Sequence, residues 1–182
     1  MAEFSGGGIV NYNSTPTATN CIFSGNTAEI GGGIYNGDAS VTLVNCSFST
    51  NTAQNGGGIY NVTFFDSSST ALINCILWGN TGQIVNIEGS STVVTYSIVQ
   101  GGYAGTGNLD KDPLFVDAAN GNLHLQSSSP AINAGLNSVN TTFVDLDGNN
   151  PRVVDDTIDM GAFEFQQQAM AVSLFYACQC RQ

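Results

Sequence analysis

The chain has 182 residues, of which 9% are charged and 42% are hydrophobic, and 22 are glycine. This length fits one domain with its own core, and so few charges among so many apolar residues exclude the composition of an intrinsically disordered chain. A net charge of −11, with only three Lys and Arg residues, opposes binding to phosphate backbones, so nucleic acid is not an expected partner. No apolar run of about 18 residues indicates a membrane span, and the first residues lack the pattern of a signal peptide.

Three glycine triplets recur at a fixed interval in the first third of the chain. They occupy residues 6–8, 31–33 and 56–58, a spacing of 25 residues in both steps. Cysteines also recur, each preceded by asparagine and followed two residues later by phenylalanine or leucine: Cys21, Cys46 and Cys75. A fourth, weaker unit has Ser97 in the cysteine position. Self-similarity at this period is the signature of a solenoid.

Short segments of alternating polarity fill each repeat. In "GGGIYN" the alternation directs Ile34 inward and Tyr35 outward, and no window shows a convincing helical period. Because one such unit cannot bury its apolar face alone, we expect stacked coils, with Ile9, Ile34 and Ile59 in one interior ladder. The sequence therefore predicts an all-β parallel β-helix of about four to six coils, with the glycines at coil corners and asparagines in turns.

Two groups of motifs resemble known proteins. "GGGIYN" with "FSGN" and "FSTN" resembles the repeats of polymorphic outer membrane proteins and of bacterial right-handed parallel β-helix repeat proteins. "GTGNLDKDPLFVDAANGNLHLQSSSPAINAGLNS" and "DLDGNNPRVVDDTIDMGAFEF" are similar to the C-terminal region of bacterial surface β-helix proteins of the choice-of-anchor Q type. The resemblance covers about residues 4–165. It implies a right-handed β-helix and an extracellular or cell-surface location, and it carries no catalytic residue.

The repeat is lost after residue 102. We therefore expect β-helix coils over residues 6–102, and a final coil with an irregular cap over residues 103–164 that covers the C-terminal end, because open ends expose strand edges. "PLFVD", "NLHLQ" and "GAFEF" are the predicted strands of this cap. Residues 1–5 are interpreted as an initiator and added residues before a truncated repeat, and residues 165–182 as a frayed or foreign tail. The uncapped first coil makes end-to-end self-association an expected mode of pairing.

The repeated cysteines are predicted to be buried free thiols. Stacked side chains lie about 4.8 Å apart, whereas a disulfide needs Cβ atoms about 3.8 Å apart. We therefore expect the cysteines to act as small apolar core residues, with disulfides as the alternative. Cys178 and Cys180, near the C-terminus, have no second cysteine pair or histidine cluster with which to form a zinc site.

Catalytic chemistry has few candidates in this chain. His124 is the only histidine, and its alternation with leucines in "NLHLQ" predicts a solvent-facing strand residue. A Ser-His-Asp triad would require it, but no G-x-S-x-G motif is present. Lys111 between Asp110 and Asp112 is the one constellation suited to a polysaccharide lyase, or to a calcium-assisted hydrolase of an ester or lactone. Arg152 is expected to pair with a nearby carboxylate.

Two oxygen-rich segments are candidate calcium sites. "DLDGNN" and "NLDKD" place carboxylate and amide oxygens at alternate positions, as calcium loops do, although the glutamate that completes an EF-hand is absent. The residues concerned are Asp145, Asp147 and Asn149 with Asp155 and Asp156 nearby, and Asn108, Asp110 and Asp112. Asx turns that cap loops are the alternative interpretation.

Outward aromatic residues are candidates for carbohydrate binding. Tyr35 and Tyr60 are expected to lie one above the other on the outer surface, and Trp78 should also face solvent. Exposed rings stack on sugars, although tyrosine is also common on sheets for packing alone. Three functions remain open at this point: a structural or adhesive module of a surface protein, a carbohydrate-binding module, and an extracellular enzyme.

Overall fold

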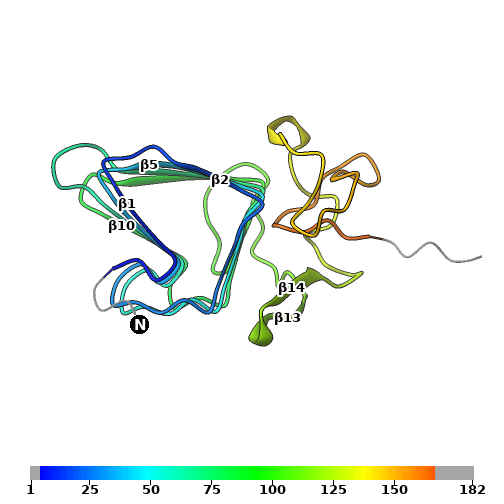
Figure 1. Cartoon of the computed structure of the whole chain (residues 1–182), viewed down its shortest axis with the longest axis horizontal. Helices are drawn as coiled ribbons and strands as arrows, with labels where there is room; N and C mark the ends of the chain where they lie inside the picture. Colours follow the sequence, from blue (N-terminus) through cyan, green and yellow to red (C-terminus); the bar gives the residue numbers. More distant parts are fainter. Residues whose placement is uncertain (1–4, 167–182) are drawn as a thin grey trace, which may run out of the picture.

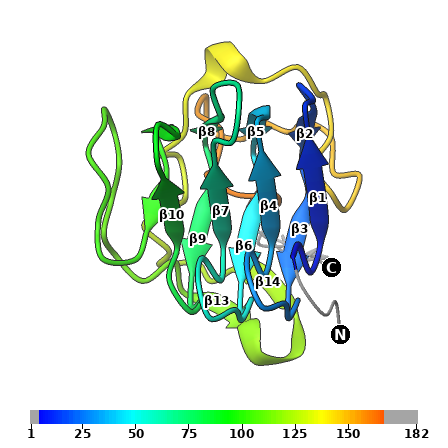
Figure 2. The same ribbon diagram turned by 90° about the vertical axis from the view of Figure 1, so that its left-hand side faces the viewer.

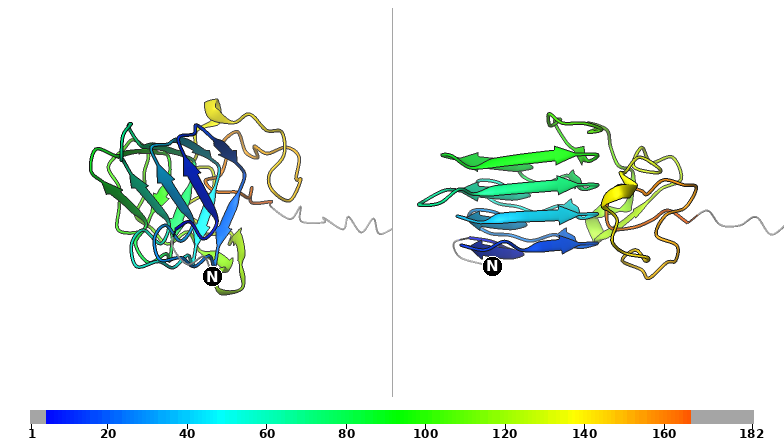
Figure 3. Two further views of the ribbon diagram at one scale, coloured as in Figure 1. Left: turned by 60° about the vertical axis from the view of Figure 1, so that its left-hand side comes forward. Right: turned by 90° about the horizontal axis from the view of Figure 1, so that it is seen from above.

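The computed structural model describes residues 5–166 and shows an all-β protein built on a parallel β-solenoid of about four turns (Figure 1). Each turn contributes one short strand to each of three parallel sheets, and the strands stack as separate layers (Figures 2 and 3). The predicted fold class is therefore confirmed. Within the described residues, no helix is long and apolar enough to cross a membrane.

The three sheets have four strands each. The first sheet consists of β1 (Ile9–Tyr12), β4 (Ile34–Gly37), β7 (Ile59–Val62) and β10 (Ile84–Ile87). The second consists of β2 (Thr17–Thr19), β5 (Ser40–Val44), β8 (Ser69–Ile73) and β11 (Ser91–Thr95). The third consists of β3 (Ile22–Ser24), β6 (Ser47–Ser49), β9 (Ile76–Trp78) and β12 (Ile98–Val99). An antiparallel pair follows, β13 (Phe115–Asp117) and β14 (Asn122–Leu125), with 3-10 turns at η1 (Ala118–Asn120) and η2 (Asn137–Val139).

The solenoid interior consists of columns of equivalent residues. Ile9 pairs with Ile34, and Ile34 with Ile59, so the predicted ladder is confirmed; Ile34 and Ile59 are fully buried. The rings of Phe23 and Phe48 stack with centroids 4.4 Å apart. These contacts bury apolar surface continuously along the stack, which no single coil could do.

The repeated cysteines are free thiols, as predicted, and Cys46 and Cys75 are buried. The hydrogen bond with Cys21 lowers the pKa of the Cys46 thiol, but the hydrogen bond with Cys75 and burial outweigh it and raise that pKa. These thiols therefore behave as small apolar core groups. Cys178 and Cys180 lie outside the described residues.

Each glycine triplet serves two purposes at a coil corner. The first glycine has positive φ, +65° at Gly31 and +62° at Gly56, which confirms the predicted turn. The second and third allow neighbouring coils to approach, because a Cβ on Gly32 or Gly33 would lie 2.6 Å from the carbonyl oxygen of Gly57 or Gly58. Side chains are thus excluded by contact as well as by conformation.

Asparagines form the corner between the second and third sheets and also a ladder inside the solenoid. Asn20, Asn45 and Asn74 have φ of +53°, +52° and +55°, as expected for turn asparagines. Inside, the Nδ2 of Asn36 donates to Oδ1 of Asn61 at 2.9 Å, and both residues are fully buried. This second column lies within the repeated word "GGGIYN" and is additional to the predicted turn asparagines.

The position of the C-terminal region differs from the prediction. Only residues 103–109 lie across the end of the solenoid, where Leu109 pairs with Ile98 and Tyr103 packs on the core. Residues 110–166, the C-terminal lobe, lie beside the stack against the third sheet (Figures 1 and 3). "PLFVD" and "NLHLQ" form β13 and β14 as predicted, whereas "GAFEF" forms no strand.

Apolar side chains on the outer surface of the third sheet explain this position. Ile76 and Ile98 point away from the solenoid core and are fully buried by the lobe, in a cluster with Met160. The backbone N–H of Gly161 donates to the carbonyl oxygen of Asn74 at 2.7 Å. Because these outward residues are apolar, burying them beneath the lobe stabilises the fold.

Candidate functional site

The outer surface of the first sheet carries no charged side chain. Its eight outward positions form two columns that run along the solenoid axis, and all eight are apolar, aromatic or glycine. We name this surface the aromatic face; its residues are Val10, Tyr35, Tyr60 and Val85 in one column, and Tyr12, Gly37, Val62 and Ile87 in the other. The solvent-facing side of a sheet usually carries polar residues, so an unbroken apolar surface indicates an interaction site.

The tyrosines of the aromatic face stack on one another. Tyr35 and Tyr60 project outward with ring centroids 5.7 Å apart and planes 13° apart, and Tyr12 lies 5.4 Å from Tyr35 at 50°. Tyr35 is only 5% exposed because rings from both neighbouring coils cover it, which corrects the expectation of a solvent-exposed ring. Burial, with the hydrogen bond to Tyr12, raises the pKa of Tyr35. Tyr12, 52% exposed, is the most open to a ligand of the three tyrosines on this face.

A loop of the third coil extends the aromatic face. This insertion loop, residues 63–67, presents Phe65 with 93% of its surface exposed, and Phe64 next to it is also exposed. Asp38 accepts hydrogen bonds from the backbone N–H groups of Phe64, Phe65 and Asp66 at 2.7, 3.2 and 3.2 Å. Desolvation alone would raise the pKa of Asp38, but these bonds outweigh it and lower that pKa. The carboxylate thus holds the loop that presents the two phenylalanines.

Gly37 brings the loop and the sheet together. A Cβ at this position would lie 2.6 Å from Cε1 of Tyr12 and 3.2 Å from Cε2 of Phe64. The two rings therefore converge on the bare backbone of Gly37. Trp78 does not belong to this surface: it points outward from the third sheet and is partly buried against the C-terminal lobe.

The segment "NLDKD" supports three separate turns. Asn108 accepts from the N–H of Ser97 at 3.1 Å, and Asp110 accepts from the N–H of Gly101 at 3.0 Å. Asp112 accepts from the N–H of Leu114 at 2.8 Å. Only the contact of Asp112 joins residues two apart, as in an Asx turn, whereas the contacts of Asn108 and Asp110 link separate turns. Lys111 between the two carboxylates is exposed.

The segment "DLDGNN" divides its side chains between different partners. Asp145 is buried and accepts from the N–H and Nδ2 of Asn149 at 2.8 and 3.0 Å, whereas Asp147 is half-exposed. Burial opposes ionisation of Asp145, but these bonds outweigh it and lower its pKa. Asp155 and Asp156 are exposed. Across residues 5–166, no three His, Cys, Asp or Glu side chains converge as metal ligands.

His124 has a defined environment that the sequence did not reveal. Its Nε2 lies 2.6 Å from Oδ2 of Asp147, its Nδ1 lies 2.6 Å from Oδ1 of Asn122, and its ring stacks on Phe163 at 3.9 Å. A cavity of about 250 Å³ adjoins this stack. The predicted strand position is correct, but the ring is half-buried because Phe163 returns beside it from a distant part of the chain.

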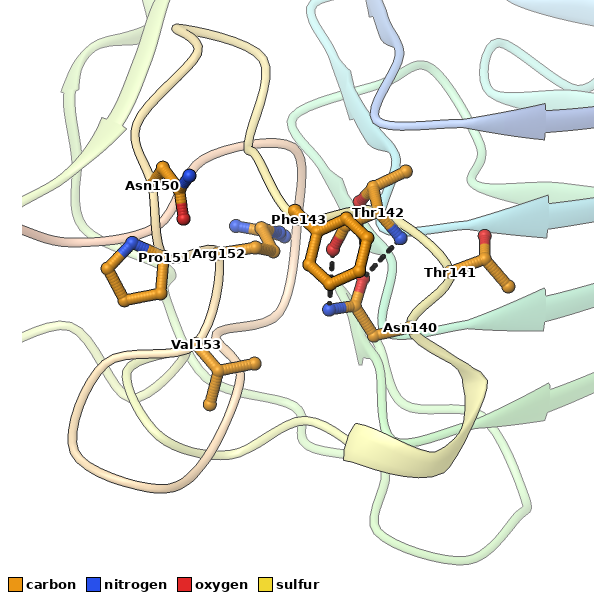
Figure 4. A pocket seen from close by; sticks show the side chains of 8 residues that line it. All are labelled: Asn140, Thr141, Thr142, Phe143, Asn150, Pro151, Arg152 and Val153. Atoms are coloured by element: carbon orange, nitrogen blue, oxygen red, sulfur yellow. Dashed lines mark hydrogen bonds between the residues drawn. The ribbon is translucent and has the colours of Figure 1, made fainter.

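A second cavity, of about 340 Å³, lies between two loops of the lobe (Figure 4). Phe143 and Pro151 supply apolar walls, while Asn140 and Thr142 hydrogen-bond each other, with Nδ2 of Asn140 donating to the Thr142 carbonyl at 2.9 Å. Arg152 also contributes to the wall, but its guanidinium is turned away towards Glu164. No reactive side chain is therefore presented to this cavity.

Arg152 pairs with a carboxylate, as the sequence predicts. Its Nη1 donates to Oε2 of Glu164 at 3.1 Å, and both side chains are buried. Burial and the nearby charge of Asp159 raise the pKa of Glu164 to about 7, although Arg152 partly offsets them.

No known family, curated protein or solved structure matches this chain.

Proposed function

We propose that this chain is an adhesive module of an extracellular or cell-surface β-solenoid protein, and that it binds neutral carbohydrate on the aromatic face and the insertion loop. The observation that carries the proposal is the uncharged apolar surface that runs over all four strands of the first sheet. The resemblance of the chain's sequence motifs to those of bacterial surface β-helix proteins supports the proposed extracellular or cell-surface location.

The chemistry of the surface favours a neutral glycan. Sugars present C–H groups that pack on aromatic rings, and hydroxyl groups that pair with phenol oxygens. Because Tyr35 and Tyr60 already cover part of each other's ring faces, contact with a sugar falls to Tyr12 and to Phe64 and Phe65 of the loop. The aromatic face carries no positively charged side chain, so nothing on it would attract an acidic glycan.

A glycan array followed by calorimetry tests this proposal. We expect Tyr12→Ala and Phe64→Ala each to weaken binding about 2- to 12-fold, the loss expected when one aromatic contact of about 0.5–1.5 kcal/mol is removed. Thr42→Ala, on the outer surface of the second sheet, is the matched control and should bind as the parent does. An array without any bound glycan, or a Tyr12→Ala/Phe64→Ala double variant with parental affinity, would contradict the proposal.

A further inference from the structure

One short segment of the C-terminal lobe bonds directly to the solenoid, in addition to the bonds that Asn20 and Asn74 make with lobe residues 136–144. The N–H of Gly161 donates to the Asn74 carbonyl at 2.7 Å, and the N–H of Ala162 donates to Oγ of Ser47 at 3.1 Å. Two carboxylates, Asp159 and Glu164, bracket these contacts and are buried with them. Any change in the charge of the two carboxylates therefore acts directly on the docking segment.

The buried carboxylates outnumber the positive charge beside them. Arg152 faces Glu164 directly, and it also lies close enough to Asp145 and Asp159 to interact with their charges. Every one of these ionised groups is largely withdrawn from water, where an uncompensated charge is costly. With all three carboxylates ionised, the cluster has a net negative charge.

The carboxylates are bonded on their ionised oxygens as well. Asp159 accepts from the N–H groups of Asn133 and Phe165, both at 2.7 Å, and Glu164 accepts from the N–H groups of Val154 and Asp159 at 3.0 and 3.1 Å. These bonds hold the lobe around the pair but do not neutralise its charge.

Water can reach the pair from one side. A cavity of about 60 Å³ is bounded by both carboxylates, and Asp155 also lines it and adds further negative charge. His124 lines the neighbouring cavity together with Glu164. A proton therefore has a short route from solvent to the buried pair.

We infer that Asp159 and Glu164 form a proton-linked latch: uptake of one proton by the pair tightens the docking of the lobe on the third sheet, and its release loosens the docking. Burial raises the pKa of both carboxyls, that of Glu164 from 4.5 to about 7. A carboxyl whose pKa is higher in the folded state stabilises that state fully below its unfolded pKa, and this stabilisation is lost as pH rises through the folded value. Docking should therefore weaken between about pH 4.5 and about pH 7.

Trp78 provides a direct readout, because it is the only tryptophan and packs against the lobe. We expect its fluorescence emission to shift to longer wavelength as pH rises through this range. Amide exchange protection at Gly161 and Ala162 should fall in parallel, while far-UV circular dichroism of the solenoid stays constant. Glu164→Gln, which mimics the protonated state, should keep Trp78 covered at every pH.

Two further variants complete the test. Asp159→Asn removes the other charge of the pair and should also flatten the pH profile of Trp78 emission. It serves as the test if the lobe of the Glu164→Gln variant does not dock on the third sheet. Asp66→Asn, on the exposed insertion loop, should keep the parental profile. A parental protein whose Trp78 emission is independent of pH, or whose docking tightens as pH rises, overturns the inference, as does a Glu164→Gln variant with the parental pH dependence.

Discussion

The glycines of each triplet allow neighbouring coils to stack closely. Gly31 supplies a backbone conformation with positive φ, whereas Gly33 has no such φ and is needed because the carbonyl oxygen of Gly58 and the ring of Phe48 lie against it. Two glycines of the same triplet thus meet different physical requirements.

Substitution of Gly33 by alanine should destabilise the solenoid by about 3 kcal/mol, because its Cβ would meet backbone that cannot move without disturbing the stack. Gly25→Ala is the matched control: its φ is +66° but nothing lies within 4 Å of the new Cβ, so only conformational strain of about 1 kcal/mol is expected. Urea unfolding measures both. Equal losses of stability would show that contact between coils is not the reason for glycine at residue 33.

The interior asparagines hydrogen-bond one another and neighbouring threonines. Asn61 accepts from Nδ2 of Asn36 and Oγ1 of Thr70, and donates to Oδ1 of Asn86 and Oγ1 of Thr92. The column recurs in the sequence at the same interval as the glycines, so the repeat alone could have revealed it. Asparagine in an alternating segment was overlooked because polar residues are usually assigned to the outside.

At the scale of elements, each strand is too short to be stable alone, and stacking sets its register. Strands of two to five residues pair with their equivalents one coil away throughout the solenoid. The insertion loop departs from this pattern, and a single carboxylate from the preceding coil organises it.

Replacing Asp38 by alanine should therefore release the insertion loop and leave the sheets intact. We expect faster amide exchange at Phe64, Phe65 and Asp66, whose N–H groups lose their acceptor, and weaker glycan binding if the loop contacts the ligand. Asp66→Ala removes a carboxylate from the same loop without removing that acceptor and should change neither. Unaltered exchange in Asp38→Ala would show that the loop is held by its own contacts.

At the scale of the whole molecule, two cores meet along the third sheet. One lies inside the solenoid, and the other lies between that sheet and the lobe, where Ile76 and Ile98 contact Leu123, Met160 and other lobe residues. The lobe therefore packs along the side of the solenoid and does not cap its end.

Thiol labelling can follow opening of the solenoid core. In a Cys178→Ser/Cys180→Ser background, we expect Cys21, which is partly exposed, to react first with a thiol reagent. Cys46 and Cys75 are buried, so they should react only at the rate of unfolding. Simultaneous reaction of all three under native conditions would show that the interior opens locally.

The repeat by itself determined the solenoid, its inward isoleucines, its turn asparagines and its free cysteines, because each of these depends on a period and on nearest-neighbour stacking. Carboxylates in "NLDKD" and "DLDGNN" could be located in the sequence, but their partners could not, since Asp147 meets a histidine 23 residues away. The exposure of Tyr35 could not be predicted from the sequence either. Alternation gives the direction of its side chain, whereas the rings that cover it come from other coils.

Only the tertiary structure decided where the C-terminal lobe lies and what its charges do. The sequence shows an acidic region after the repeat, but the apolar outer surface of the third sheet becomes a docking site only when Ile76 and Ile98 are stacked side by side. The same folding brings Asp159, Glu164 and Arg152 out of water together. Burial and proximity are properties of three-dimensional packing, so they follow from the stack and cannot be read from the order of residues along the chain.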